Sequence, residues 1–294
     1  MSLGRWAYLK DGYVRASEAA VSPFDRGFLF AHAAYEVTAV YGGRLLDPDG
    51  HFARLERTLS GIELPALAGR GELLEIHDVL IDRNGLDEGL VYLQITGGDY
   101  GGRDFAGPET LAPTLFLFTM EKPLIGASAR DGVRAVSVED TRWSRRAMKT
   151  TQLLSQALAY RAARAAGCET AWMHEDGVVT EAASANAWIV TREGVLVTRE
   201  LSSSILAGIT RDRVKQLVER AGGRIEERAF TLDEAFGAAE AFTTSAGALI
   251  NPTIEIDAMR IGNGRPGPVT RRVQRLYYEA MGADIACVAP WARD

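Results

Sequence analysis

Hydrophobic positions in the N-terminal part of the chain alternate between the two-residue period of strands and the longer period of helices. Residues 6–9 and 13–14 flank Asp11-Gly12, a pair that tolerates the positive φ angles of a type I′ turn, so they predict a hairpin. The predicted elements of this part are hairpins over 6–14 and 35–46, helices over 52–62 and 73–81, and buried strands at 91–95 and 115–118. We expect the two helices to pack on one sheet.

A change in composition divides the chain. Residues 121–130, with Pro123, Gly126 and several small side chains, have the character of an interdomain linker. This predicts a small N-terminal domain over residues 1–120 and a larger C-terminal domain over residues 131–294. The second domain is predicted to hold strands at 133–138, 170–174, 186–191 and 194–198 and helices at 151–166, from 210 onward and at 269–281. Since these elements mix without strict βαβ alternation, we expect an α+β fold.

Composition narrows the function classes. Hydrophobic residues make up 47% and charged residues 24% of the chain, as in ordinary globular proteins, and the net charge is -6. We therefore expect no nucleic-acid partner and no membrane partner, and no apolar run approaches the length of a membrane span. Cys168 and Cys287 fit neither a disulfide framework nor a metal-ligand spacing, so we expect no metal and a reducing, cytoplasmic location.

Lys149 stands at the entrance to an apolar, alanine-rich segment and follows Arg142, Arg145 and Arg146. A lysine at a helix start is usually a solvated charge. The alternative is a Schiff-base lysine, whose amine must be close to other cations or desolvated to become nucleophilic. Residues further along the chain decide between the two interpretations.

Two downstream segments carry complementary chemistry. Glu181, 32 residues after Lys149 (181 minus 149), lies among small neighbours, where a carboxylate is unusual, although alone it would be a solvated turn residue. Gly208 precedes a predicted helix with Thr210 as its expected N-cap. The amide groups and the dipole of such a helix start favour a phosphate, although every capped helix offers them.

Two more features could bind an anion. Residues 242–248 predict a strand that ends in hydroxyls and small residues, where a backbone can approach an anion closely. Arg54, in the first domain, is a candidate charge-assisted phosphate ligand. Each feature alone is more often structural than functional. Together they supply an amine for an aldehyde, a carboxylate for a pyridinium and three elements for one phosphate.

In this order the features resemble the fold-type IV pyridoxal-phosphate enzymes, which include D-amino acid aminotransferases, branched-chain aminotransferases, R-selective amine transaminases and aminodeoxychorismate lyase. The resemblance implies a small α/β domain, a larger pseudo-barrel domain, pyridoxal 5′-phosphate bound between them and a homodimer. It covers nearly the whole chain and rests on Phe24-Asp25-Arg26-Gly27-Phe28, Tyr35-Glu36-Val37, the Arg54 helix, Arg142-Trp143 through Lys149, the Glu181 segment, Gly208-Ile209-Thr210 and Gly267-Pro268-Val269-Thr270.

The resemblance also implies a role for each matching residue. Lys149 would form the Schiff base and transfer the proton in a ping-pong transamination between an amino donor and a keto-acid acceptor, and Glu181 would pair with the pyridine nitrogen. Tyr35 would line the substrate side. The remaining cofactor contacts would come from Leu206 on the ring and from Arg54, Gly208, Ile209, Thr210, Ser245 and Ala246 around the phosphate.

Within the family, the sequence is most similar to the D-amino acid aminotransferases, through Arg142-Trp143, residues 171–173 and residues 186–190. The glycine-rich segment 97–104 predicts a mobile loop, and it aligns Gly102 and Asp104 where that subgroup has an arginine and a histidine that bind the substrate carboxylate. Arg103 could replace them by a shift of one residue. If it does not, R-selective amine transamination is the principal alternative; branched-chain transamination and a pyridoxal-phosphate lyase also stay open.

The remaining polar residues carry less information. His32, shortly before Tyr35, could face the substrate or be a packed structural histidine. His51 could orient its neighbours, cap the helix that carries Arg54, or touch substrate. We expect His77 and Arg146 on solvated surfaces, as for most isolated charged or polar residues.

Overall fold

The computed structural model describes residues 5–292, and the chain forms two compact units. The residues predicted as a linker, 121–130, include the end of one strand and most of a short helix. The first unit consists of Met1–Leu124 and Met148–Gln152, and the second of Ile125–Ala147 and Leu153–Asp294. The segment that carries Lys149 therefore belongs to the first unit, although the chain on both sides of it belongs to the second.

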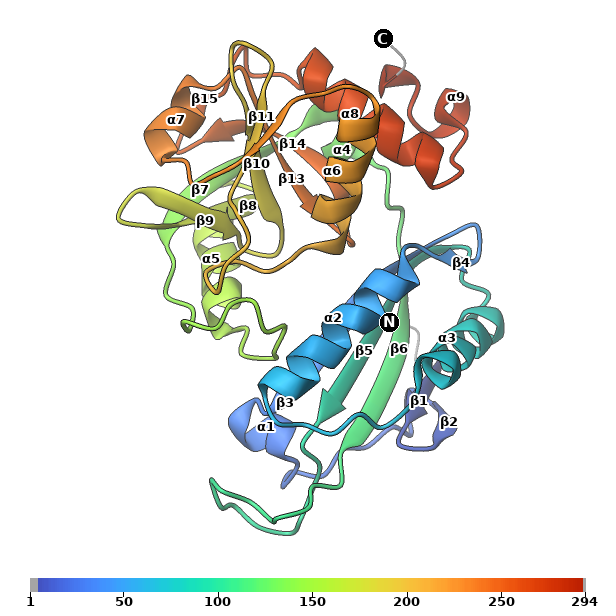
Figure 1. Ribbon diagram of the computed structural model, residues 1–294. Helices are drawn as coiled ribbons and strands as arrows, with labels where there is room; N and C mark the ends of the chain where they lie inside the picture. The colour runs from blue at the N-terminus through green and yellow to red at the C-terminus, as the bar shows by residue number, and fades with distance from the viewer. Residues whose placement is uncertain (1–4, 293–294) are drawn as a thin grey trace. The chain divides into compact units, whose positions relative to one another are not determined.

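Within the described residues, the first unit contains a six-stranded antiparallel sheet in the order β2-β1-β6-β5-β3-β4 (Figure 1). The predicted hairpins and both buried strands are confirmed. The strands are β1 (Trp6–Leu9), β2 (Gly12–Arg15), β3 (Ala33–Tyr41), β4 (Arg44–Leu45), β5 (Glu88–Thr96) and β6 (Thr114–Glu121). A short helix, α1 (Arg26–Phe30), precedes β3.

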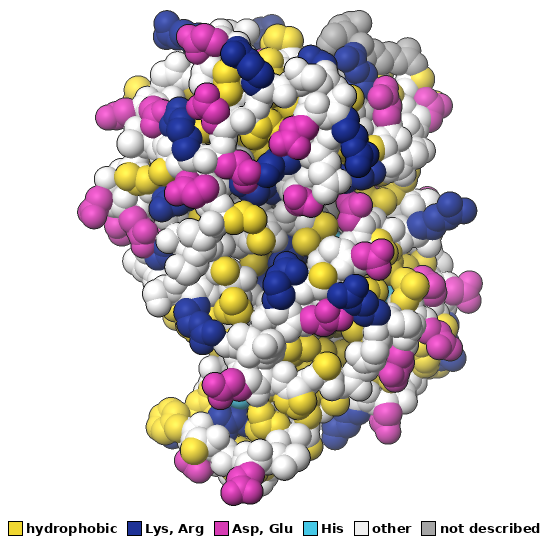
Figure 2. All heavy atoms as spheres, viewed as in Figure 1, with side chains coloured by type: hydrophobic (Ala, Val, Ile, Leu, Met, Phe, Trp, Pro, Cys, Tyr) yellow, Lys and Arg dark blue, Asp and Glu magenta, His cyan; other side chains and the backbone are white. Residues whose placement is uncertain are grey.

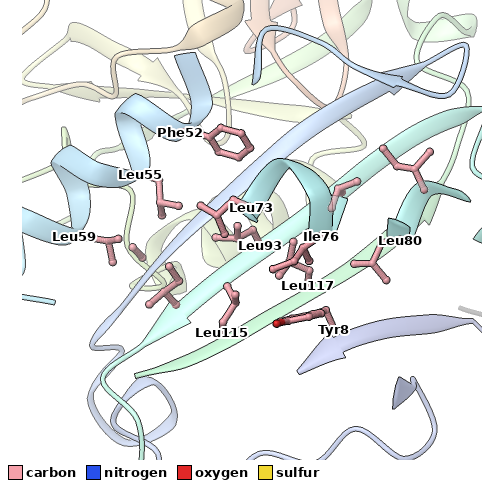
Figure 3. Packing of buried hydrophobic residues seen from close by; sticks show 14 of the residues in the cluster. Tyr8, Phe52, Leu55, Leu59, Leu73, Ile76, Leu80, Leu93, Leu115 and Leu117 are labelled. Carbon is pink, nitrogen blue, oxygen red and sulfur yellow. The ribbon is translucent and has the colours of Figure 1, made fainter. Parts of the chain in front are cut away.

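Helices α2 (Pro48–Gly61) and α3 (Arg70–Asn84) cover one face of this sheet, as predicted. Proline suits the first turn of α2 because no intrahelical donor is lost there, and Gly85 ends α3 at φ 57°. Leucines of both helices meet alternate residues of β5 and β6 (Figure 3). The labelled members of this core are Tyr8, Phe52, Leu55, Leu59, Leu73, Ile76, Leu80, Leu93, Leu115 and Leu117.

The surface position predicted for His77 is wrong. Its ring is 1% exposed, contacts Phe52 edge-on and places Nδ1 2.6 Å from the carbonyl oxygen of Leu73, one turn earlier in α3. Burial lowers the pKa of His77, so the neutral ring is favoured. A local backbone acceptor thus satisfies the imidazole inside the core, which a search for acidic partners in the sequence could not reveal.

Within residues 5–292, the second unit contains a nine-stranded mixed sheet whose main path is β12-β11-β10-β13-β14-β7-β8-β9. A tight turn over residues 183–185 joins β9 directly to β10, so the strands from β10 to β9 curl into a partly closed ring. This agrees with the expected α+β fold with a pseudo-barrel. The strands are β7 (Val133–Glu139), β8 (Thr170–Glu175), β9 (Val178–Ala182), β10 (Asn186–Val190), β11 (Leu196–Thr198), β12 (Ile225–Glu227), β13 (Glu240–Ser245), β14 (Leu249–Ile256) and β15 (Met259–Arg260).

Helices pack on this sheet in two groups. α5 (Leu154–Ala165) lies against β7 and β8, whereas α6 (Ile209–Arg220) and α8 (Pro268–Ala280) contact each other and β13 (Figure 1). Helix α6 starts one residue earlier than predicted, so its N-cap is Gly208 and Thr210 lies inside the first turn. The shorter helices are α4 (Ala127–Asp131), α7 (Leu232–Gly237), α9 (Ile285–Val288) and the 3₁₀ turn η1 (Pro290–Ala292).

Acidic and basic side chains are interspersed over the face shown in Figure 2. Among residues 5–292, every helix is too short or too polar to span a bilayer. The same residues contain no group of three or more His, Cys, Asp or Glu side chains arranged to hold a metal ion.

Candidate active site

The backbone around Lys149 is fixed against the first unit. The amide of Tyr35 in β3 donates to the carbonyl oxygen of Lys149 at 3.0 Å, and the amide of Thr151 donates to Ala33 at 3.2 Å. The amide of Lys149 donates to Oγ1 of Thr58 in α2 at 3.2 Å. The residues flanking Lys149 therefore add an extended segment beside β3, which explains their place in the first unit.

The amine of Lys149 lies over an aromatic side chain. Its Nζ is 4.1 Å from the centroid of the Tyr35 ring, and Tyr35 stacks on Tyr92 with centroids 5.7 Å apart. Both Lys149 and Tyr35 remain partly accessible to solvent. The amine is thus held at a defined place and can still be reached by a small molecule.

Beside this segment, a buried ion cluster joins β3 to α2. Glu36 accepts hydrogen bonds from Nε and Nη2 of Arg54 at 2.8 and 2.7 Å and lies 2.8 Å from Nδ1 of His51. Burial alone would raise the pKa of Glu36, but the Arg54 guanidinium and His51 hold it well below its usual range. Burial lowers the pKa of His51, and the charges of Arg54 and Lys149 lower it further. His51 thus orients Glu36, one of the roles expected for it.

Glu181 lies in β9 of the second unit with its carboxylate buried. Nη1 of Arg142 pairs with its Oε1, Nδ2 of Asn186 donates to Oε2 at 3.0 Å, and the amide of Leu206 is 3.3 Å from Oε2. Burial raises the pKa of Glu181 above its usual value, and Arg142 opposes that shift incompletely. A buried carboxylate with this environment favours a cationic partner.

The start of α6 is open for an anion. Within this fully described helix, no side chain hydrogen-bonds to the first-turn amides, and Gly208 leaves the approach clear. A Cβ at Gly208 would lie 1.9 Å from Oδ1 of Asn186, the residue that holds Glu181. Helix α6 packs on β13, whose last residue is Ser245, and Ala246 begins the following turn. Both backbone segments expected at a phosphate therefore belong to one unit.

The two residues expected at the substrate lie in the first unit. His32 accepts from Nε of Arg26 at Nδ1, 3.2 Å away, so its Nε2 carries the proton and donates to Ile62 at 2.9 Å. Arg103 is exposed, with its guanidinium 5.5 Å from the Phe30 ring centroid and 5.1 Å from that of Phe105. His32 is thus a packed residue with both nitrogens engaged, whereas Arg103 is accessible to a ligand.

The predicted residues thus fall into two sets. The described part of the chain fits pyridoxal phosphate in three respects: an accessible amine on a fixed backbone, a buried carboxylate that favours a cation, and an uncapped helix start with a glycine that a side chain would block. Tyr35, His32, Arg54, Arg103 and Lys149 belong to the first unit, and Glu181, Leu206, Gly208, Ile209, Thr210, Ser245 and Ala246 belong to the second.

Sequence comparison adds independent information. A profile of the family described as amino-transferase class IV matches residues 33–256, which is more than half of the chain. The chain belongs to the class IV aminotransferases. Enzymes of this class depend on pyridoxal 5′-phosphate, so the protein is a pyridoxal-phosphate-dependent transaminase that acts on an amino donor and a keto-acid acceptor.

Individual class IV aminotransferases align over nearly their full length. A D-alanine aminotransferase of Bacillus licheniformis is 36% identical over 92% of this chain and 95% of its own. A branched-chain amino acid aminotransferase of Escherichia coli has the same fold, with a TM-score of 0.87, 24% identity and 94% of each chain covered. A T.th. branched-chain enzyme solved with pyridoxamine 5′-phosphate gives a TM-score of 0.85 at 23% identity, with 94% of each chain covered.

The structure adds residues that sequence reasoning had not assigned to this aminotransferase site. Asn186 and Arg142 both contact Glu181, and Asp140 holds Arg142. The predicted surface position of Arg146 is wrong, because its guanidinium is buried between Asp140 and Glu175. Arg142 was visible in the sequence as part of a family motif, but the pairing of these charges depends on strands that meet only in the folded chain.

Proposed function

We propose that this class IV aminotransferase transfers the amino group of a D-amino acid to a 2-keto acid, with D-alanine as the first donor to test. The buried Glu181 carboxylate, which favours a cationic nitrogen beside it, is the observation that carries the transaminase chemistry. The preference for a D-amino acid is supported by the 36% identity to a relative named as a D-alanine aminotransferase. Ping-pong kinetics are expected.

The cofactor, when bound, supplies an electron-withdrawing ring that stabilises negative charge on the substrate α-carbon. In this proposal Lys149 holds the cofactor covalently, yields that position to the substrate amine, and then moves the α-proton with its Nζ. Glu181 accepts the proton of the pyridine nitrogen, so the positive charge stays on the ring. Leu206 packs on the ring, and Tyr35 bounds the substrate side.

The phosphate would be held by groups from both sets of residues. Amides at the start of α6 and the amide of Ala246 donate hydrogen bonds, the Ser245 and Thr210 hydroxyls add two more, and Arg54 contributes charge. The bond from Glu36 to Arg54 uses Nε and Nη2. In this role, Glu36 keeps the guanidinium in one orientation for the phosphate.

Absorbance of the purified protein tests the cofactor and the donor together. We expect the visible band of the bound cofactor to disappear on addition of D-alanine and to persist with L-leucine or R-1-phenylethylamine. Loss of the band with R-1-phenylethylamine alone would favour R-selective amine transamination, and loss with L-leucine alone would favour branched-chain transamination. Lack of any band after addition of pyridoxal phosphate would contradict the cofactor assignment.

The accessible guanidinium of Arg103 gives a prediction about the substrate carboxylate. Replacement of Arg103 by alanine should lower kcat/KM for D-alanine by about 10- to 100-fold, the value of a hydrogen bond to a charged group. Steady-state kinetics should attribute most of this loss to KM. Arg57→Ala, at an exposed position of α2, is the matched control and should leave kcat/KM unchanged. An unchanged KM in the Arg103 variant would remove Arg103 from the substrate site.

Two further parts of the proposal concern the protein's assembly and location. We propose a homodimer, as the family resemblance implies, and light scattering at micromolar concentration should give twice the chain mass. We also propose that the enzyme works in a reducing cytoplasm, in keeping with two cysteines that form no disulfide within residues 5–292. Cell fractionation of the native host would test the location.

A further inference from the structure

A second buried carboxylate stands behind Glu181. Asp140 follows β7, and its side chain is 0% exposed. It accepts hydrogen bonds from Nε and Nη2 of Arg142 at 2.9 and 2.6 Å and from Oγ1 of Thr180 at 2.6 Å. The remaining terminal nitrogen of Arg142, Nη1, pairs with Glu181. One guanidinium therefore serves two buried carboxylates.

The charges of this cluster do not balance. Arg146 places Nε 3.5 Å from Asp140, but its Nη2 pairs with Glu175 at 2.6 Å. Asp140, Glu175 and Glu181 carry three negative charges, and Arg142 and Arg146 carry two positive charges. The cluster therefore has one negative charge in excess before any ligand binds.

The excess charge falls on Glu181 rather than on Asp140. Asp140 receives two nitrogens of the Arg142 fork, the amide of Arg142 at 3.1 Å and the hydroxyl of Thr180, whereas Glu181 receives one guanidinium nitrogen. The two pKa values move in opposite directions. Burial raises both, but hydrogen bonds from Arg142 bring the pKa of Asp140 below its usual value, while that of Glu181 stays raised.

We infer that Asp140 is a positioning residue of the active site: it binds the Arg142 guanidinium and thereby leaves Glu181 with an unbalanced charge for the proton of the pyridine nitrogen. This inference rests on the proposed role of Glu181. Asp140 acts through Arg142 and needs no contact with the cofactor. Without Asp140, Arg142 would neutralise Glu181 fully, and the carboxylate would hold the ring proton less firmly.

Asp140→Asn tests the link in the protein without cofactor. Carboxyl infrared bands, assigned by comparison with Glu181→Gln, report the protonation of Glu181 during a pH titration. We expect Glu181 to protonate at lower pH in Asp140→Asn than in the wild type, because Arg142 then serves Glu181 alone. Glu175→Gln removes a charge from the half-exposed end of the same cluster and should leave the titration of Glu181 unchanged. An unchanged titration in Asp140→Asn would overturn the inference.

The loaded enzyme supplies a second readout. With ¹⁵N-labelled pyridoxal phosphate, we expect the nitrogen chemical shift to move toward the unprotonated value in Asp140→Asn, and the cofactor Kd to rise by roughly tenfold, as for other residues that orient a ligand-binding group. A wild-type ring nitrogen that is already unprotonated would contradict the role proposed for Glu181. In that case a shifted infrared titration would still support the link between Asp140 and Glu181.

A double variant separates charge balance from simple structural damage. Asp140→Asn with Arg142→Gln removes one negative and one positive charge, so Glu181 again carries the excess. We expect the ¹⁵N shift to return to the protonated value in this variant, even if Asp140→Asn alone fails to fold. A shift that stays at the unprotonated value in the double variant would overturn the inference, because a purely structural role predicts greater damage from two substitutions than from one.

Discussion

Replacement of Lys149 by alanine should abolish transamination while the cofactor still binds through its phosphate and ring contacts. The proton transfer assigned to Nζ is worth about 100- to 10,000-fold in rate, and loss of covalent attachment adds to that. Single-turnover absorbance with D-alanine should therefore show no conversion on the wild-type timescale. Equilibrium dialysis with pyridoxal phosphate should show binding weakened but retained.

Two comparisons make this result specific to the amine. Lys122→Ala changes an exposed lysine of the same unit and should leave turnover unchanged. Small primary amines added to the Lys149 variant should restore part of the proton transfer, because they can occupy the space of the missing side chain. Wild-type turnover in Lys149→Ala would show that another group performs the chemistry.

Replacement of Glu36 by glutamine should destabilise the protein by about 3–5 kcal/mol, the usual cost of removing one partner from a buried ion pair. Glutamine keeps the shape of the side chain but removes the charge that Arg54 and His51 surround, and all three side chains are buried. Urea unfolding followed by circular dichroism would measure the change in the free energy of unfolding.

The pair between Glu56 and Arg70 is a matched control for this variant. It has the same two-pronged geometry, with both distances 2.7 Å, but its side chains are about half exposed. Glu56→Gln should therefore change stability little, because solvent screens exposed pairs. Equal effects of the two substitutions would mean that burial of Glu36 does not determine its contribution.

Acidity should reduce the difference between wild type and Glu36→Gln. Because the pKa of Glu36 is depressed in the folded protein, its ionised form contributes stability above the unfolded-state value of about 4.3. That contribution is lost as pH falls from there through the lower folded-state pKa. Stability measured at a series of acidic pH values should therefore converge for the two proteins, and a constant difference would contradict the depressed pKa.

Local patterns in the sequence predicted much of this structure. Period-two and period-3.6 positions located the first sheet and the helices on it, because each pattern reports which face of one element is buried. The strands β9 and β14 were not predicted, and their pairing follows from long-range register rather than from their own residues. The α+β class and the family followed from the order of motifs along the chain.

Pairings between distant charges could not be predicted. The sequence indicated Arg54 as a phosphate ligand, and that role stays a prediction, but nothing local indicated that Glu36 would bind its guanidinium. The same is true of Asp140, which meets Thr180 only because β7 and β9 flank β8 in the sheet. Such contacts depend on tertiary structure and leave no periodic pattern in the chain.

The division of the chain has a consequence for fragments and chimaeras. The chain passes from one unit to the other at Leu124/Ile125, Ala147/Met148 and Gln152/Leu153. A fragment that stops at Leu124 would lack the strip that pairs with Ala33 and Tyr35, and would lose Lys149 with it. A ribosome must therefore synthesise part of the second unit before the first can be completed. Exchanging either unit with that of a relative would require three crossovers instead of one.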